Sequence, residues 1–308
     1  VQLEWFVDNL NATNHPSQLA AMHQAGTFSE GRYTAEVPGQ TNRSIVRFRV
    51  RANRAGTNEV VSPRADDVAK WHSYFVSPIR PASTNRAYEI LISKEALRVL
   101  RTNIAFEPKR AIRPDPPGAL RESWNATQPA VFVYDGRVYD VQMRHHGSQF
   151  RREEGRRSYK LRFADYDLFE EQDSIFITDK DYRTQTGHAL FRAAGLPTSL
   201  TRWVDLYFNE NAKLQRLEQE EYNQQMLDRW VNEQAWLGND RSAEANSVIY
   251  KAMGVGGLPG EGPFGPADGR ILPPVTNPPT KTVFWTPLQR SEPNYGIQNQ
   301  AWRGHTEL

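Results

Sequence analysis

The first 62 residues show the alternation of apolar and polar positions that is typical of β-strands with one buried face. In residues 46–52, Val and Phe alternate with Arg at every second position. Residues 4–8 and 31–38 carry further strand patterns. We therefore predict a β module over residues 1–62.

Residues 88–252 mix strand and helix patterns. Asp135-Gly136, between two apolar runs, predicts a two-residue hairpin turn of type I′. Gly195, followed by Pro197, predicts the end of a helix. The order of elements predicts one α+β layer with mostly antiparallel strands. Strands are expected at 88–92, 130–134, 137–141, 158–163, 201–208 and 247–252, and helices at 93–103, 182–194 and 218–237.

Two segments have the composition of irregular structure. Residues 63–87 contain three Pro and several charges, and we interpret them as a linker. Residues 253–293 contain nine Pro and many Gly, which predicts a long irregular insertion. Residues 294–308 end in a pattern that is typical of the start of a helix, and we assign them to a further region of the protein.

The strands of residues 1–62 resemble the later strands of an immunoglobulin-like or fibronectin-like β-sandwich. A complete sandwich of this kind needs about seven strands and roughly 100 residues. Fewer strands are predicted here, and the chain begins at Val1 without Met. We therefore expect the first strands of a partial sandwich to precede Val1 in a longer, processed protein.

The composition excludes several classes of site. The chain has no Cys, which excludes disulfides, thiolate zinc sites and Cys nucleophiles. No apolar run approaches the ~20 residues that a membrane-spanning helix needs, so we predict no membrane span. The formal net charge is only +2, so the protein as a whole has no strongly basic character.

The positive charge is instead concentrated in residues 144–163, which hold seven Arg or Lys and two His. The same stretch contains two Glu and few aromatic residues, so it lacks the stacking surface of a nucleic-acid site, and we predict no nucleic-acid partner. His145 and His146 are neighbours on a predicted strand and point to opposite faces, so we assign no metal site to them.

Four short motifs, in order, resemble the CotH kinase family, which is named for spore-coat protein H. The second motif joins a helix end to a strand and is the most specific of the four. The first motif is RHHGS at 144–148 followed by RRSYKLRF at 156–163, and the second is LFRAAGLP at 190–197 with WVDLYFN at 203–209. The third is LEQ at 217–219, and the last is YK at 250–251.

The resemblance implies the N-terminal lobe of an atypical kinase over residues 88–252. The fold class that we predict is therefore α+β, with a partial immunoglobulin-like sandwich followed by a kinase-like lobe. The family's activity implies ATP and Mg²⁺ as cofactors and Ser or Thr of another protein as the phosphate acceptor. The resemblance assigns six nucleotide-binding residues: Arg144, Gly147, Ser148, Arg157, Lys160 and Glu218.

The chemical reasons for these residues differ. Gly147 beside Ser148 allows backbone N–H groups to approach a phosphate, and the basic strand supplies positive charge. Glu218 would hold a basic side chain, as the Lys–Glu pair does in ordinary kinases. We assign the neighbouring Glu220 and Glu221 to the exposed surface of the predicted helix.

Two departures from the family pattern matter for activity. The basic pair before the Ser-aromatic motif is Arg156-Arg157 where the family has Lys, and the two side chains bind phosphate differently. No equivalent of the family's metal-binding and catalytic Asp residues is found before Leu308. We therefore leave the catalytic residues unassigned and expect the chain alone to be inactive as a kinase.

An alternative interpretation is a non-catalytic assembly component of a bacterial cell-surface structure. In that case the partner is another copy or another surface protein, and the basic stretch has a structural role. Both interpretations predict a secreted or surface-exposed bacterial protein. They differ in whether nucleotide binds.

Overall fold

The computed structural model describes residues 1–26, 31–53, 59–64, 66–80, 82–105, 126–146, 157–179, 182–209, 213–246, 250–253 and 284–287. The chain packs into two compact units. The first unit gathers Val1–Glu95, Ala130–Asp140 and Asp205–Leu214. The second gathers Ala96–Pro129, Val141–Val204 and Gln215–Leu308.

The N-terminal segment forms an antiparallel sheet around one long strand, β5. Its order is β2-β1-β5-β6, and β7 also pairs with β5. Leu3, Trp5 and Val46 are buried on one face, as the alternation predicts. The strands are β1 (Gln2–Asp8), β2 (Gln18–Ala21), β5 (Ile45–Ala52), β6 (Val60–Ser62) and β7 (His72–Phe75), and β3 (His23–Ala25) and β4 (Arg32–Thr34) pair separately.

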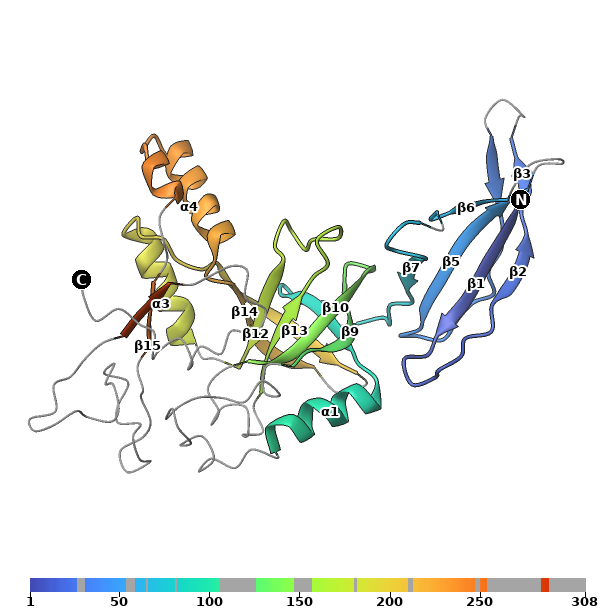
Figure 1. Cartoon of the computed structure of the whole chain (residues 1–308), viewed down its shortest axis with the longest axis horizontal. Coiled ribbons are helices and arrows are strands. Elements are labelled where there is room, and N and C mark those ends of the chain that lie inside the picture. The colour runs from blue at the N-terminus through green and yellow to red at the C-terminus, as the bar shows by residue number, and fades with distance from the viewer. Residues whose placement is uncertain are drawn as a thin grey trace, which may run out of the picture. The chain divides into compact units, whose positions relative to one another are not determined.

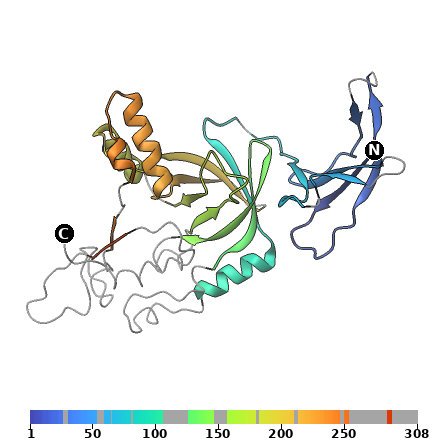
Figure 2. The ribbon, with the colours of Figure 1, turned by 45° about the horizontal axis from the view of Figure 1, so that its top comes forward.

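Seven further strands close into a barrel in the order β10-β11-β12-β14-β13-β8-β9. Figures 1 and 2 show these strands curving around a common interior, with α1 at one end of the labelled strands. The strands are β8 (Arg86–Leu91), β9 (Gln128–Tyr134), β10 (Arg137–His146), β11 (Ser158–Arg162), β12 (Ser174–Thr178), β13 (Thr201–Phe208) and β14 (Leu214–Glu220).

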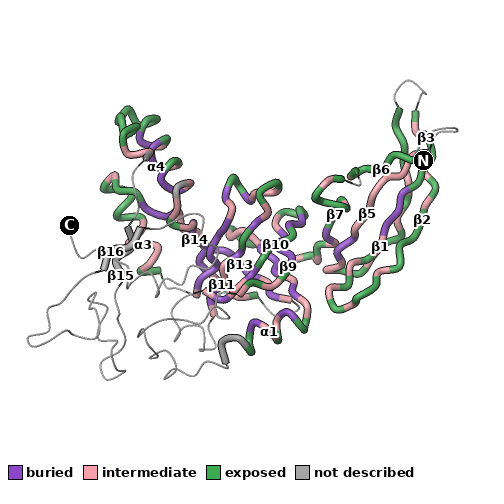
Figure 3. The backbone as a smooth tube through the Cα atoms, in the orientation of Figure 1, coloured by how far each residue is buried: buried purple, intermediate pink, exposed green. Residues whose placement is uncertain are grey.

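Alternation along the barrel strands determines which side chains point inward. Met143, Leu161 and Ile175 are register partners across β10, β11 and β12, and all three are fully buried. Residues two positions away on each strand therefore also face the interior, and the residues between them face outward. Figure 3 shows the buried positions gathered on the barrel strands.

Helices are short and few in the described part of the chain. They are α1 (Lys94–Ala105), α3 (Tyr182–Ala193), α4 (Gln224–Trp236) and a 3₁₀ helix (Ser242–Asn246). Asn223 caps α4, because its side chain accepts a hydrogen bond from the Met226 N–H. The last described strands, β15 (Tyr250–Met253) and β16 (Phe284–Pro287), pair with each other. None of the described helices is long and apolar enough to cross a membrane.

The predicted fold class is wrong. The described residues are mostly β, with a closed seven-stranded barrel and three short α-helices, and they form neither an immunoglobulin-like sandwich nor a kinase-like lobe. The prediction contained no strand at 174–178 and extended the helix of 218–237 over β14. The prediction therefore lacked β12 and β14, two of the seven strands that close the barrel.

Several local predictions are confirmed. Asp135 and Gly136 both have positive φ, 48° and 74°, as a type I′ turn requires. Gly195 has φ 75° directly after α3, where Gly is favoured because it has no Cβ. The basic stretch contains strands β10 and β11, as the alternation indicated.

The first unit contains an apolar cluster that joins the N-terminal sheet to barrel strands. Ile45 and Phe75 pack with Val131, Val133 and Val138, all buried. The same unit also contains a charged contact: Arg47 donates hydrogen bonds to both carboxylate oxygens of Asp140, at 2.8 and 2.6 Å. The predicted segments 1–62 and 88–252 therefore share a core.

The buried carboxylate of Asp205 gives a pH prediction for the first unit. Burial alone raises its pKa, but hydrogen bonds from Asn85, Ser83 and Lys213 outweigh burial and lower the pKa below its ordinary value of 3.8. A carboxyl with a lowered pKa stabilises the fold above that ordinary value, and this contribution disappears as the pH falls through the folded-state pKa.

We expect Asp205→Asn to lower the melting temperature at neutral pH and to flatten its fall in acid. Thermal unfolding followed from neutral pH to below pH 3.8 measures both effects, since 3.8 is the ordinary pKa of this carboxyl. Asp165→Asn, at an exposed position, is the control and should leave the curve unchanged. Parallel acid curves for wild type and Asp205→Asn would contradict the assignment.

Candidate functional site on the barrel wall

The outward face of β10 and β11 carries two cations side by side. Arg144 and Lys160 are register partners, and both alternate with the inward residues Met143 and Leu161. Like charges directly opposite each other repel, so this pair requires anionic neighbours. The structure thus brings together two of the residues that the sequence assigned to nucleotide binding.

Glu221 supplies the anionic contact. The Lys160 Nζ lies 2.6 Å from Glu221 Oε1, and the side chain of Lys160 is only 19% exposed. The Ser174 hydroxyl, on β12, donates to the other carboxylate oxygen of Glu221. Both oxygens of Glu221 are therefore engaged, and the position of the lysine is fixed by a charge-assisted hydrogen bond.

The local sequence explains the position of Glu221. It follows the last residue of β14 and precedes Asn223, the N-cap of α4. The Asn223 amide donates to Asp173 at 3.4 Å, and Asp173 accepts from the Ser174 hydroxyl at 3.0 Å. The end of β14, the start of β12 and the cap of α4 are thereby linked around the carboxylate.

Burial dominates the electrostatics of this cluster. Burial lowers the pKa of Lys160, Glu221 raises it, and the neighbouring Arg144 lowers it further. Burial also lowers the pKa of Arg144, against a weaker opposing effect of Glu221. Arg144 donates to the His145 carbonyl at 3.1 Å and makes no ion pair with any residue in the described ranges.

An aromatic surface adjoins the two cations. Phe176 is the register partner of Lys160 on β12, and the Lys160 Nζ lies 5.6 Å from its ring centroid. The His146 ring stacks on Phe176 with centroids 4.0 Å apart. The outward face therefore combines two cations with a stacked pair of rings.

The other predicted site residues lie elsewhere. Glu218 pairs with Ile177 in the register, so it points into the barrel, on the opposite side of the wall from Lys160. There it contacts Arg202, with Nε to Oε2 at 3.2 Å. Arg157 immediately precedes β11, two residues before the inward-facing Tyr159. Gly147 and Ser148 lie outside the described residues.

The sequence therefore predicted a Lys–Glu pair but with Glu218 as the acidic partner. That assignment placed Glu218 on a helix, whereas residue 218 is on β14 and the helix begins at Gln224. Glu221, which was assigned to an exposed helix surface, is the carboxylate that contacts Lys160. Asn223, a good N-cap residue two positions after Glu221, was the signal in the sequence that the helix begins only after Glu221.

Among the described residues, no group of three or more His, Asp or Glu side chains is placed to hold a metal ion. The carboxylate closest to the cations, Glu221, is already engaged by Lys160 and Ser174. We therefore derive no step through Mg²⁺ from these residues.

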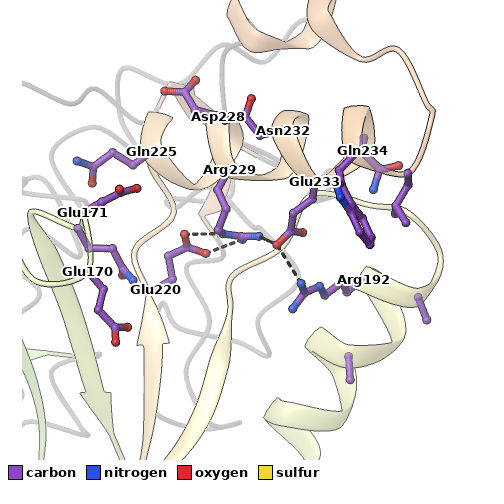
Figure 4. A pocket seen from close by; sticks show the side chains of 15 residues that line it. Glu170, Glu171, Arg192, Glu220, Gln225, Asp228, Arg229, Asn232, Glu233 and Gln234 are labelled. Carbon is purple, nitrogen blue, oxygen red and sulfur yellow. Dashed lines mark hydrogen bonds and ion pairs between the residues drawn. The ribbon is translucent and has the colours of Figure 1, made fainter.

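A cavity of about 1050 Å³ lies beside α3 and α4. Figure 4 shows its central contacts, in which Arg229 reaches Glu220 and Glu233, and Arg192 also reaches Glu233. None of Arg144, Arg157, Lys160 and Glu218, the predicted nucleotide-binding residues within the described ranges, lines this cavity. Its charged groups are largely occupied with one another, so we do not take it as the candidate site.

A scan against protein-family models found no match, and a search of curated proteins found no significant match either. The resemblance to the CotH kinase family therefore stays a prediction that rests on the quoted motifs.

Proposed function

We propose that the outward cluster of Arg144, Lys160 and Glu221 binds the phosphate groups of a nucleotide. In this proposal the chain is part of an ATP-dependent phosphoryl transferase that acts on Ser or Thr of an exported protein. The observation that supports it best is Arg144, a partly buried guanidinium without an ion pair in the described ranges, beside a lysine that a carboxylate holds in place.

The charges of the cluster favour an anionic ligand. A charge removed from water is costly unless an opposite charge compensates it. Glu221 contacts Lys160 and accepts from the hydroxyl of Ser174, and the amide of Asn223 donates to Asp173. A phosphate oxygen beside Arg144 would supply the missing negative charge and would accept hydrogen bonds from its fork of N–H donors.

The Lys160–Glu221 contact has the form of the ion pair that positions a phosphate-binding lysine in kinases. In the proposal, Glu221 orients Lys160, and Lys160 and Arg144 bind and neutralise the phosphates. The rings of Phe176 and His146 provide an apolar surface next to these charges. The residues that would activate the acceptor hydroxyl are not assigned.

The proposal predicts that ATP stabilises the protein and that this effect depends on Lys160. A ligand that binds only the folded state raises stability by RT ln(1 + [L]/Kd), which is about 1.4 kcal/mol at a concentration near ten times Kd. We expect Lys160→Gln and Glu221→Gln to remove most of the ATP-induced rise in melting temperature. Thermal unfolding with and without ATP, each with and without Mg²⁺, measures it.

Arg162→Gln is the matched control, because Arg162 is an exposed cation on the same strand. It should keep the response to ATP. If wild type shows no rise with millimolar ATP, or if Arg162→Gln loses as much of the rise as Lys160→Gln, the proposed nucleotide site is wrong.

A second candidate function, self-assembly at a cell surface, is supported by exposed apolar side chains. None of the described residues of α3 is buried, and Leu190 and Phe191 on it are 65% and 56% exposed. Trp236, at the end of α4, is 86% exposed. Exposed apolar groups of this size favour contact with another chain. Light scattering across a concentration series distinguishes an associating protein from a strict monomer.

A further inference from the structure

A second basic cluster lies on the inward face of the barrel wall. Arg157 lies immediately before β11, two residues before the inward-facing Tyr159, and Arg216 on β14 precedes the inward-facing Glu218 by two. Asp179 follows β12 between them, and its N–H donates to the Ser158 hydroxyl at 3.1 Å. The cluster therefore lies where β11 begins and β12 ends.

The two arginines have unused hydrogen-bonding capacity. The Nε atoms of Arg157 and Arg216 are both buried and have no hydrogen-bond partner. Arg216 keeps one ion pair, Nη1 to Asp179 Oδ1 at 3.2 Å. Arg157 makes no ion pair with any residue of the described ranges. A buried N–H without an acceptor is costly, so these donors indicate a missing acceptor.

A third arginine and a phenol complete the cluster. Arg101, on α1, acts electrostatically on both Arg157 and Tyr159. Burial lowers the pKa of Arg157, and the positive charge of Arg101 lowers it further, against the opposing effect of Tyr159. Arg216, Arg157 and Arg101 thus all act electrostatically on the Tyr159 phenol, and Asp179 contacts Arg216.

Glu218 does not neutralise this excess charge. Its carboxylate contacts Arg202 at 3.2 Å, and this pair is neutral overall. Among the described residues, Asp179 is the carboxylate that contacts this cluster, through Arg216.

We propose that Arg101, Arg157 and Arg216, with Tyr159, form a binding site for a tetrahedral oxyanion, either free phosphate or the phosphate group of a monoester. The site is separate from the outward cluster, because alternation places the two on opposite faces of β11. It does not depend on nucleotide binding at Lys160.

The chemistry favours phosphate over a simple carboxylate. A phosphate dianion carries about two charges near neutral pH and offers oxygens in several directions, which matches guanidinium groups that come from three different elements. Asp179 already gives Arg216 a carboxylate partner, so the ligand does not need to be a second carboxylate. The buried Nε–H groups and the Tyr159 hydroxyl would act as donors to the anion.

Arg157→Gln gives the sharpest test, because Arg157 has no ion pair to lose in the described structure. Inorganic phosphate is titrated into the full chain by calorimetry, and ³¹P NMR line broadening gives a second readout. We expect Arg157→Gln to weaken phosphate binding about tenfold or more, as expected for loss of a hydrogen bond from a charged donor. Arg216→Lys keeps the charge near Asp179 but loses the fork of donors, and should weaken binding as well.

Arg162→Gln is a control on the same strand and should leave phosphate binding unchanged. Arg157→Gln also separates the two proposals, since it should weaken phosphate binding while sparing the ATP response that depends on Lys160. Comparison of phosphate with phosphoserine distinguishes a free anion from a monoester. The proposal is overturned if wild type does not bind millimolar phosphate or phosphoserine, or if Arg157→Gln binds them as tightly as wild type.

Discussion

Replacement of Glu89 by Ala is expected to lower the free energy of unfolding by about 3–5 kcal/mol, the range for breaking a buried ion pair by removing one partner. Glu89, on β8, is 2% exposed. Its carboxylate contacts the guanidinium groups of Arg43, at 2.9 Å, and of Arg80. Its removal would leave two guanidinium groups beside each other without this anion.

The surroundings of Glu89 limit how the structure can adapt. The Arg80 guanidinium lies 3.7 Å from the centroid of the Tyr207 ring, so its position is fixed by packing as well as by charge. Burial lowers the pKa of Arg80, and the nearby Arg43 lowers it further. The two arginines therefore repel each other, and we expect the loss of Glu89 to affect the whole first unit.

Urea denaturation followed by tryptophan fluorescence measures this loss. Glu59→Ala is the matched control, because Glu59 forms an ion pair with Arg51 in which both side chains are more than 30% exposed. Solvent screens an exposed pair, so this control should change stability little. Equal losses for Glu89→Ala and Glu59→Ala would refute a special role for the buried carboxylate.

Local structure could be predicted from the sequence wherever backbone chemistry decides it. The Asp135-Gly136 turn needs two residues that tolerate positive φ, and few dipeptides satisfy this requirement. The end of α3 is marked in the same way by Gly195, because Gly adopts the positive φ that this position requires. These signals act within a few residues of the chain, so no knowledge of the tertiary structure was needed.

Closure of the barrel could not be predicted, because it depends on two strands with weak local signals. The five residues of β12 are all buried, and a continuous buried run has no alternation to mark it as a strand. In β14, Leu217 is followed by Glu218, Gln219 and Glu220, which are good helix formers, yet all four are buried in a strand. Tertiary pairing with β12 outweighs their local preference.

The candidate site shows the same limit. The resemblance assigned Arg144 and Lys160 to one site, and the structure makes them register partners on two adjacent strands. The choice of Glu218 as the acidic partner depended on the distant β14, where a change of one position moves a side chain to the opposite face. Glu221 reaches Lys160 because it lies just beyond the end of that strand.

The largest effect in the second unit is expected at Arg229, whose replacement by Ala should lower the free energy of unfolding by about 3 kcal/mol. Arg229 donates to both carboxylate oxygens of Glu220, at 2.8 and 2.6 Å, and Glu220 is 4% exposed. It also donates to the Thr198 carbonyl at 2.9 Å and pairs with Glu233. Figure 4 shows Arg229 between the two carboxylates.

Arg192→Ala is the control for this prediction, because Arg192 pairs with the same Glu233 but is 53% exposed. Its loss should cost less than about 1 kcal/mol, since solvent screens an exposed pair. Glu220 would keep the hydrogen bond from the Leu200 N–H, at 3.0 Å, but would remain buried without its cation in Arg229→Ala. Chemical denaturation of both variants measures the difference. If Arg192→Ala is as destabilising as Arg229→Ala, then burial of Glu220 is not the cause, and the contact between α3 and α4 through Glu233 would have to be the main stabilising interaction.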